Sequence, residues 1–232
     1  MKMNLLLLFL AAMVVRATSQ PPNPFPLPYD YYSVVFQWAK SVYNTGVNQC
    51  IKPTFPAFTL HGLWPQWYRF PPLDDCRQNP RSANFENASI PDPVRNNLIQ
   101  YWPNMYGPNE AFWGHEYEKH GSCVDPFYSN QLTYFVTALR VATSTDLYSI
   151  LAAAGILCGN PTTVGAVRTA IHASTGFWPT VQCNRSITRT LQLLQIYLCF
   201  NKITNVPMDC PIVQKGCIDP IDYPRPIIWQ YL

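Results

Sequence analysis

The residues best suited to chemistry are concentrated in one stretch, FWGHEYEKHG, at positions 112 to 121. It holds two histidines, two glutamates and a lysine, although only 12% of the chain is charged. If the stretch is helical, Glu116 and His120 share a face, with Lys119 and His115 beside them. An imidazole that titrates near neutrality next to fixed charges suits acid–base catalysis. The bracketing aromatic residues predict a half-buried helix and argue against the alternative, a solvated face with Glu–Lys pairing.

A second histidine, His61, lies upstream in FTLHGLWP at positions 58 to 65. A histidine on a strand is often only structural, but the neighbours of this one favour a site. Gly62 would let backbone or a ligand approach closely, and Trp64 and Trp67 offer flat faces on which a base could stack. The sequence therefore provides two imidazoles on separate elements.

Several reaction classes do not fit these residues. A zinc protease motif needs histidines four apart, whereas His115 and His120 are five apart. No serine lies in a nucleophile-elbow motif, and disulfides should consume most cysteines. A substrate that supplies its own nucleophile fits better, as RNA does through its 2′-hydroxyl. One histidine would remove that proton and the other would protonate the departing 5′-oxygen. Lys119 and protonated His115 would neutralise the phosphate, and Glu116 would orient or donate to it.

Two strands are predicted before the catalytic stretch, at 32–38 and 57–64, from their alternating residues. The second strand should place Leu60 and His61 on opposite faces, and Gly62 and Pro65 should then break it. The segment between these strands is expected to be a loop.

The middle of the chain predicts helices, and the last third returns to strands. The expected helices are one capped by Asp92, with Pro93 in its first turn, and ending at Trp102, one at the catalytic stretch, one capped by Ser129, one capped by Asp146, and one over 163–175 closed by Gly176. The expected late strands are 180–183, 191–200 and 226–231. Strands at both ends of a helical middle predict an α+β fold with a central antiparallel sheet and helices packed on it.

The N-terminal residues 1–19 have the pattern of a secretory signal peptide, so we expect one mature domain at 20–232. No later segment approaches eighteen apolar residues in a row, so no membrane span is expected. Removing Lys2 and Arg16 lowers the formal net charge from +3 to +1. Bulk charge therefore does not argue for a polyanionic partner, and any such attraction must be local.

Export also bears on the cysteines and on two glycosylation motifs. Eight cysteines in an exported chain predict disulfides, but the sequence alone cannot choose among about 105 pairings. Asn87 and Asn184 each begin a glycosylation sequon.

The two histidine segments, FTLHGLWP and FWGHEYEKHGSC, resemble the two active-site signatures of the ribonuclease T2 family, in the family's order. The chain is most similar to the plant stylar self-incompatibility ribonucleases and their S-like relatives. The resemblance runs from Phe36-Gln37-Trp38 to Cys217. It implies a secreted endoribonuclease, monomeric and without metal or other cofactor. Such an enzyme cleaves single-stranded RNA through a 2′,3′-cyclic phosphate.

The resemblance also implies a role for each catalytic residue. His61 matches the general acid of the family and His120 matches its general base. Glu116 and Lys119 match the transition-state stabilisers, and His115 matches a phosphate-contacting position.

Base recognition is implied by the same resemblance. The residues where relatives contact a base are Gln37, Asn104, Tyr106 and Phe112, and Trp64 falls at the other base site. Tyr106 is the loosest match, so base preference stays open.

For the cysteines, the resemblance implies the pairs Cys76–Cys123, Cys183–Cys217 and Cys199–Cys210. The chain departs from its relatives at Cys50, because Tyr43 stands near where the usual partner belongs. Cys158 is additional, so a Cys50–Cys158 bridge and two free thiols are both open.

Three biological roles are compatible with this resemblance. The low charge density and the irregular region 65–91 favour the self-incompatibility type, which would have a pollen recognition protein as partner. The retained His115 resembles the S-like enzymes of RNA turnover and phosphate recycling. An inactive binding or storage relative would usually have lost a signature histidine, and both are present here.

Overall fold

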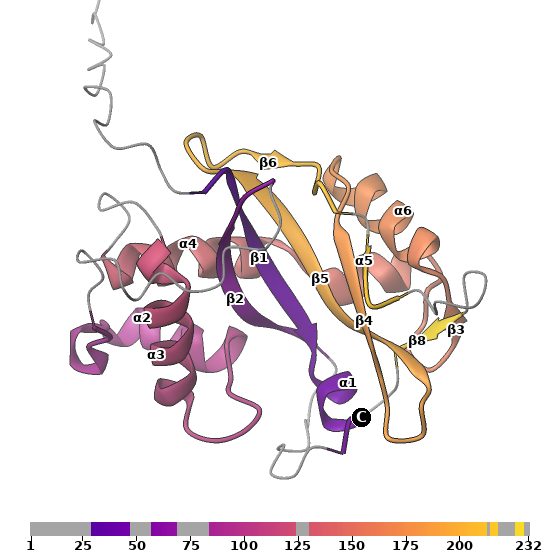
Figure 1. The fold of residues 1–232 in the computed structure, drawn as a ribbon, viewed down its shortest axis with the longest axis horizontal. Helices are drawn as coiled ribbons and strands as arrows, with labels where there is room; N and C mark the ends of the chain where they lie inside the picture. The colour runs from indigo at the N-terminus through magenta and orange to yellow at the C-terminus, as the bar shows by residue number, and fades with distance from the viewer. Residues whose placement is uncertain are drawn as a thin grey trace, which may run out of the picture.

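The structure is a computed structural model and describes residues 29–46, 57–68, 84–123, 130–212, 214–217 and 226–229. One sheet runs through the molecule with helices packed beside it (Figure 1). The predicted α+β fold is confirmed. No helix in the described ranges is long and apolar enough to cross a membrane.

The four long strands form the body of the sheet in the order β2-β1-β5-β4, and neighbours are antiparallel, as predicted. They are β1 (Tyr31–Trp38), β2 (Phe58–Gln66), β4 (Thr180–Arg185) and β5 (Leu191–Asn201). Shorter strands are β3 (Pro161–Thr162), β6 (Pro207–Met208), β7 (Gln214–Lys215) and β8 (Ile227–Ile228). Because β7 runs parallel to β4 and β8 parallel to β5, the whole sheet is mixed.

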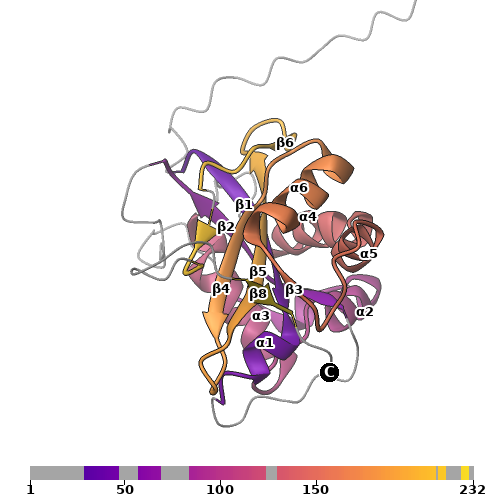
Figure 2. The same cartoon turned by 90° about the vertical axis from the view of Figure 1, so that its right-hand side faces the viewer.

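The predicted helices form, together with a short one that was expected to be loop. They are α1 (Ala39–Tyr43), α2 (Asp92–Tyr101), α3 (Asn109–Lys119), α4 (Gln131–Ser144), α5 (Leu147–Ala153) and α6 (Val164–Thr175), with 3₁₀ turns η1 (Asn87–Ser89) and η2 (Gly121–Cys123). Helices α4, α5 and α6 gather on one face of the sheet (Figure 2). As predicted, α6 ends at Gly176, whose φ of 82° is in the left-handed region.

The helix N-termini correct two predictions about caps. Asp92 is the first residue of α2 rather than its cap, and Pro91 takes the cap position. For α4 the cap is Asn130, whose side chain accepts from a backbone N–H, while Ser129 lies outside the described residues. Asp146 caps α5 as predicted.

The central strand β1 is buried along its whole length, because both faces of the sheet are covered. On the helix face lies the main core, which includes Trp38, Trp102 and Trp113, each at most 1% exposed. The opposite face carries a smaller cluster around Val35 and Tyr197. The site described below lies on this second face.

The edge strand β2 contains a β-bulge at His61. The pairing of β1 with β2 skips this residue, because Leu60 and Gly62 face consecutive residues of β1. Strict alternation would put Leu63 on the same face as His61. The bulge instead returns Leu63 to the main core and places Trp64 on the other face.

Strand β2 also runs further than predicted. Neither Gly62 nor Pro65 breaks it, and the strand continues to Gln66. Proline is tolerated at the edge of a sheet, where its missing N–H removes no bond to a second neighbour.

Disulfides staple the C-terminal part of the chain. Two predicted pairs are confirmed, Cys183–Cys217 and Cys199–Cys210. Cys123 is also disulfide-bonded, and its predicted partner Cys76 lies outside the described residues.

The additional cysteine, Cys158, is a buried free thiol. Its Sγ lies 3.2 Å from the backbone oxygen of Trp229. A Cys50–Cys158 bridge is therefore not formed, and Cys50 lies outside the described residues.

Candidate active site

The two candidate catalytic histidines meet at one buried carboxylate. His61 Nε2 lies 3.8 Å from Glu116 Oε1, and His120 Nε2 lies 4.0 Å from Glu116 Oε2. The indole of Trp64 contacts both imidazoles, with ring centroids 4.9 Å from His61 and 5.1 Å from His120. The sequence placed these residues on separate elements, and the fold brings them to one point.

Helix α3 presents Glu116 to this point and ends at His120. The carboxylate is on the buried face of the helix and is only 1% exposed. His120 takes the C-cap position, where its backbone N–H donates to Glu116 O at 2.9 Å. The Tyr134 hydroxyl of α4 lies 3.2 Å from that oxygen and 3.0 Å from the carbonyl oxygen of Leu63. These contacts fix α3 against β2.

The bulge residue His61 is held by its backbone as well as by its ring. Its carbonyl oxygen accepts a bond of 2.8 Å from the indole N–H of Trp102 in the core. The Nδ1 atom of its ring contacts the side-chain amide of Gln195 on β5. The other ring nitrogen, Nε2, is the one that faces Glu116.

The Glu116 carboxylate is oriented by a bond that depends on a glycine. Trp64 Nε1 donates to Glu116 Oε2 at 2.7 Å. A methyl group at Gly62 would overlap both of these atoms. The sequence predicted a close approach of backbone or a ligand at Gly62, whereas the nearest atoms belong to side chains of the site.

The electrostatic setting favours neutral His61 in this structure. Burial and the positive charges of His115 and Lys119 lower the pKa of His61 from 6.5 to about 4. Its side chain nevertheless remains 29% exposed, so a substrate can reach it. Helix α3 carries both cations, His115 on its exposed side and Lys119 half-buried near its end. An anion bound here would offset their effect on His61.

The predicted base-contacting residues line one cavity next to His61. The cavity has a volume of about 230 Å³. The residues from the prediction that line it are Gln37, Asn104, Tyr106 and Phe112, and Asn184, Leu194 and Gln195 lie on the sheet side. The sequence thus identified the residues of one wall of this cavity and missed those from β4 and β5.

Within the cavity, Asn104 shapes the loop that forms the wall. Its Oδ1 accepts from the backbone N–H of Tyr106 at 2.8 Å, and its Nδ2 donates to Pro108 O at 2.8 Å. Gln37 is 4% exposed, and within the described ranges its amide nitrogen meets no acceptor. The amide nitrogen of Gln37 could therefore donate a hydrogen bond to a ligand in the cavity.

Trp64 was expected at a second base site. Its described contacts are with Glu116 and with the rings of His61, His120 and Tyr197. Its function in base recognition stays a prediction.

The two sequons are in different environments. Asn87 is exposed on η1. Asn184 lines the cavity beside His61, where its Nδ2 donates to Ser41 O at 3.0 Å and its Oδ1 accepts from Gln192 at 3.0 Å. A glycan on that nitrogen would occupy part of the cavity beside His61 and would compete with any ligand there. The predicted glycan at Asn184 stays a prediction.

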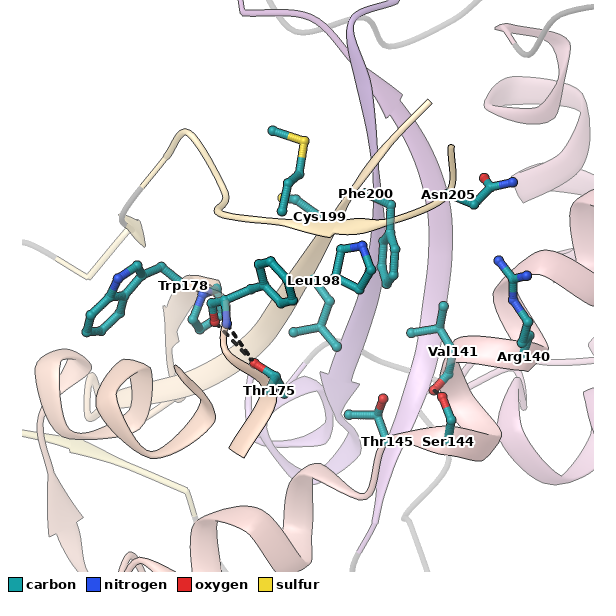
Figure 3. Close-up of a pocket in the computed structure, with 14 residues that line it drawn as sticks. Arg140, Val141, Ser144, Thr145, Thr175, Trp178, Leu198, Cys199, Phe200 and Asn205 are labelled. Carbon is teal, nitrogen blue, oxygen red and sulfur yellow. Dashed lines mark hydrogen bonds between the residues drawn. The ribbon is translucent and has the colours of Figure 1, made fainter. Parts of the chain in front are cut away.

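A separate cavity of about 290 Å³ lies between α4, the end of α6 and strands β5 and β6 (Figure 3). Its walls include Val141, Leu198 and Phe200, with Arg140 at one side. None of the predicted catalytic or base-contacting residues lines it, so it is distinct from the histidine site.

Sequence reasoning missed Gln195, which contacts His61, and Tyr134, which joins α3 to β2. A signal for Gln195 existed, because LQLLQIYLCF places two glutamines in an otherwise apolar strand. Buried polar side chains usually have a specific hydrogen-bond partner. No periodicity signal could have identified Tyr134. Within the described ranges, no group of three His, Cys, Asp or Glu side chains could hold a metal ion.

Comparison with known sequences identifies one family. A sequence model of the ribonuclease T2 family matches residues 29–210. Ribonuclease 1 of Arabidopsis thaliana is 34% identical over 205 residues, covering 84% of this chain and 86% of that protein. Extracellular ribonuclease LE of Solanum lycopersicum is 33% identical, covering 84% and 87%. Intracellular ribonuclease LX of the same species is 31% identical, covering 84% of each chain.

Solved structures agree with the sequence relatives. Ribonuclease MC1 from the seeds of bitter gourd aligns with a TM-score of 0.74 at 26% identity, covering 87% of this chain and all of that one. The gametophytic self-incompatibility associated SF11-RNase of Nicotiana alata aligns with a TM-score of 0.72 at 26% identity, covering 88% and 100%. The family model and these relatives span the elements that build the histidine site, and the chain belongs to the ribonuclease T2 family of RNA-cleaving enzymes.

Proposed function

We propose that this enzyme cleaves single-stranded RNA by transphosphorylation. The 2′-hydroxyl of RNA attacks the neighbouring phosphorus, the bond to the 5′-oxygen breaks, and a 2′,3′-cyclic phosphate forms. The observation that carries the proposal is the approach of both histidines to one buried carboxylate, at 3.8 and 4.0 Å. Two proton-transfer groups within reach of a single phosphodiester are what this reaction requires.

Each histidine has a separate proton to move. His120 accepts the proton of the 2′-hydroxyl as general base. His61 donates a proton from Nε2 to the departing 5′-oxygen as general acid. Glu116 lies between the two rings and stabilises whichever one is an imidazolium at each stage.

The cations of α3 hold the phosphate. The side chains of His115 and Lys119 are close enough to lower the pKa of His61, and hence close enough to neutralise charge on phosphate oxygens next to it. The negative phosphate in turn makes protonation of His61 more favourable. Binding of substrate therefore prepares the acid.

The cavity beside His61 binds one base. Its volume of about 230 Å³ suits a ligand smaller than a drug-sized molecule. Phe112 supplies an aromatic face 5.7 Å from the His61 ring. The amide nitrogen of Gln37, which meets no acceptor among the described residues, supplies a donor for a base carbonyl. Asn104 and Tyr106 complete the outer wall.

The test is digestion of RNA by the purified protein with and without a chelator. We expect metal-independent cleavage, a cyclic phosphate at the new 3′ end, and no cleavage of DNA, which lacks the 2′-hydroxyl. Replacing His61 or His120 with alanine should abolish turnover and leave the fold intact. His172→Ala is the matched control, because that ring stacks on Trp178 outside the site. Near wild-type turnover in His120→Ala would refute the assignment.

For the biological role, stylar self-incompatibility with a pollen recognition protein as partner is the first candidate from sequence. The likeness to the SF11-RNase supports it. The retained His115 and the higher identity to Ribonuclease 1 than to Ribonuclease S-7 of Nicotiana alata, 34% against 29%, favour an S-like role in RNA turnover. A transcript confined to styles and a highly polymorphic locus would support the first role. Expression in other tissues would support the second.

We propose that the protein is secreted as one domain, residues 20–232, after removal of residues 1–19. The apolar leader and the disulfides of the fold support export. Among the relatives, one is named extracellular and another intracellular. N-terminal sequencing of the mature protein should therefore find a start near Gln20, and a start at Met1 would refute it.

A further inference from the structure

A hydrogen-bonded chain of three side chains lies behind the ring of His61, on the side away from Glu116. Gln195 of β5 contacts His61 Nδ1 through its side-chain amide. The hydroxyl of Tyr197 lies 3.0 Å from Gln195 Oε1 and also contacts Oε1 of Gln182 on β4. This hydrogen-bonded chain therefore connects His61 on β2 to Gln182 on β4, through Gln195 and Tyr197 of β5.

The hydroxyl of Tyr197 forces all the hydrogen bonds of this set to run in one direction, either away from His61 or toward it. A phenol has one proton, so it cannot donate to two amide oxygens at once. A half-turn of one glutamine amide, which exchanges its oxygen and nitrogen, resolves the conflict. Two arrangements then satisfy every donor and acceptor, and they run in opposite directions.

In the first direction, His61 Nδ1–H donates to Gln195 Oε1, Gln195 Nε2–H donates to Tyr197, and Tyr197 donates to Gln182. In the reverse direction, Gln182 donates to Tyr197, Tyr197 donates to Gln195, and Gln195 Nε2–H donates to a lone pair on His61 Nδ1. The first direction accepts a protonated imidazole. The second fits only a neutral ring with its proton on Nε2.

Burial makes the choice of direction matter. Tyr197 is 3% exposed and Gln195 is 5% exposed, so neither can turn to solvent for another partner. Burial raises the pKa of Tyr197, so its hydroxyl keeps its proton throughout the working range. Gln182 is half-buried, so the chain can reverse at that end with help from water.

The charged groups around this unit come from two sides. Helix α3 presents Glu116, His115 and Lys119 to the His61 ring, and His120 follows at its end. On the far side, Lys215 Nζ of β7 lies 4.5 Å from the centroid of the Tyr197 ring. The side chain that contacts Nδ1 of His61, by contrast, is a neutral amide. It can accept a hydrogen bond from protonated Nδ1 or donate one to unprotonated Nδ1.

We propose that Gln195 is a positioning residue for the general acid. It holds the His61 ring by Nδ1 so that Nε2 faces the scissile phosphate. When His61 is the acid, Gln195 accepts a hydrogen bond from Nδ1–H, and Tyr197 and Gln182 complete that hydrogen-bonded chain. The inference deepens the proposed function and rests on the role of His61 there. In catalysis His61 loses only its Nε2 proton, so the bond from Nδ1 to Gln195 is kept throughout the step.

The first test is an NMR titration of the four histidine rings, with pH profiles of kcat/KM, in wild type and variants. Gln195→Leu removes the Nδ1 partner. It should lower the pKa of His61 and reduce kcat/KM by about 10- to 100-fold, as expected when a bond to a charged group is lost. Gln195→Glu supplies a carboxylate to Nδ1–H and should move the alkaline limb to higher pH.

Two further variants separate the chain from general damage to the fold. Tyr197→Phe removes a hydroxyl that does not touch His61, and it should still shift the His61 titration. Gln192→Leu is the matched control, because this buried glutamine of β5 bonds to Ser41 and Asn184 rather than to His61. It should leave the His61 titration in place.

The outcomes are separable from those of the proposed function. Unchanged His61 titration in both Gln195 variants refutes the positioning role, even if RNA is cleaved. An unshifted titration in Tyr197→Phe refutes the chain beyond Gln195. If wild type cleaves no RNA, the proposed function fails, and the NMR titrations alone decide whether Gln195 controls His61.

Discussion

A methyl group added at Gly62 should damage the site by displacing the Glu116 carboxylate or the Trp64 indole. Gly62 does not have a positive φ angle, so alanine can adopt the backbone conformation of β2 at this position. The new Cβ would overlap Glu116 Oε2 and Trp64 Nε1, the two atoms joined by the 2.7 Å bond. Because both side chains are held in place, one of them must move and the bond must lengthen or break.

The magnitude follows from the bond that is lost. A hydrogen bond to a charged group contributes about 1.5–3 kcal/mol, and a misplaced Glu116 remains buried. If the whole loss appears in the transition state, kcat falls by about 10- to 150-fold. Without the overlap, the same Gly→Ala change would stabilise the fold by about 0.4–1 kcal/mol, because the unfolded chain loses freedom. Gly62→Ala should therefore lower the stability of the fold if the overlap occurs, and raise it if the overlap does not occur.

The assay is kcat on RNA together with the thermal midpoint of unfolding. Gly165→Ala in α6 is the matched control, since its new Cβ meets only Thr163 Oγ1 at 3.8 Å, an ordinary contact. Trp64→Phe removes the N–H donor but keeps an aromatic ring, so it should reproduce the loss of kcat without steric overlap. Wild-type kcat with an equal or higher midpoint in Gly62→Ala would show that Glu116 does not need this bond.

Two more predictions concern pH and glycosylation. The pKa of His61, lowered to about 4, sets the alkaline limb of kcat/KM in the acidic range, while bound phosphate should move the limb of kcat to higher pH; coincident limbs would contradict the role of phosphate. The unfolded chain binds this proton below about pH 6.5 and the folded chain only below about 4, so stability falls as pH drops across that window. His61→Ala should lack this component of the unfolding midpoint. In secreted protein, mass spectrometry should find glycan at Asn87, and a fully glycosylated Asn184 in active enzyme would contradict binding of a base in the cavity.

Much of the fold could be read from local patterns in the sequence. The long strands and the longer helices follow from the periodicity of apolar residues within one element, and capping residues mark some of the helix ends. The short helix α1 was missed because five residues carry too little periodicity to be recognised. The α2 cap was wrong because Asp92 at the first helical position also interacts favourably with the helix dipole, and sequence cannot separate the two positions.

The candidate catalytic residues could be proposed from the sequence because their types are scarce in this chain and two motifs carry them. Their support was missed because it comes from residues distant in sequence. Gln195 is 134 positions from His61, and Tyr134 is 71 positions from Leu63. Such contacts depend on which strands pair and in which register, and the pattern within a single strand or helix specifies neither.

The register itself contains the feature on which the site depends. Leu60 and Leu63 both reach the main core although they are three apart, which requires an extra residue between them, and that residue is His61. Strand β5 has a second irregularity at Leu194, so Leu194 and Gln195 both line the cavity although they are neighbours. A bulge leaves one residue outside the ladder and changes the direction of its side chain. His61 and Gln195 therefore meet because two strands each depart from strict alternation at the same place in the sheet.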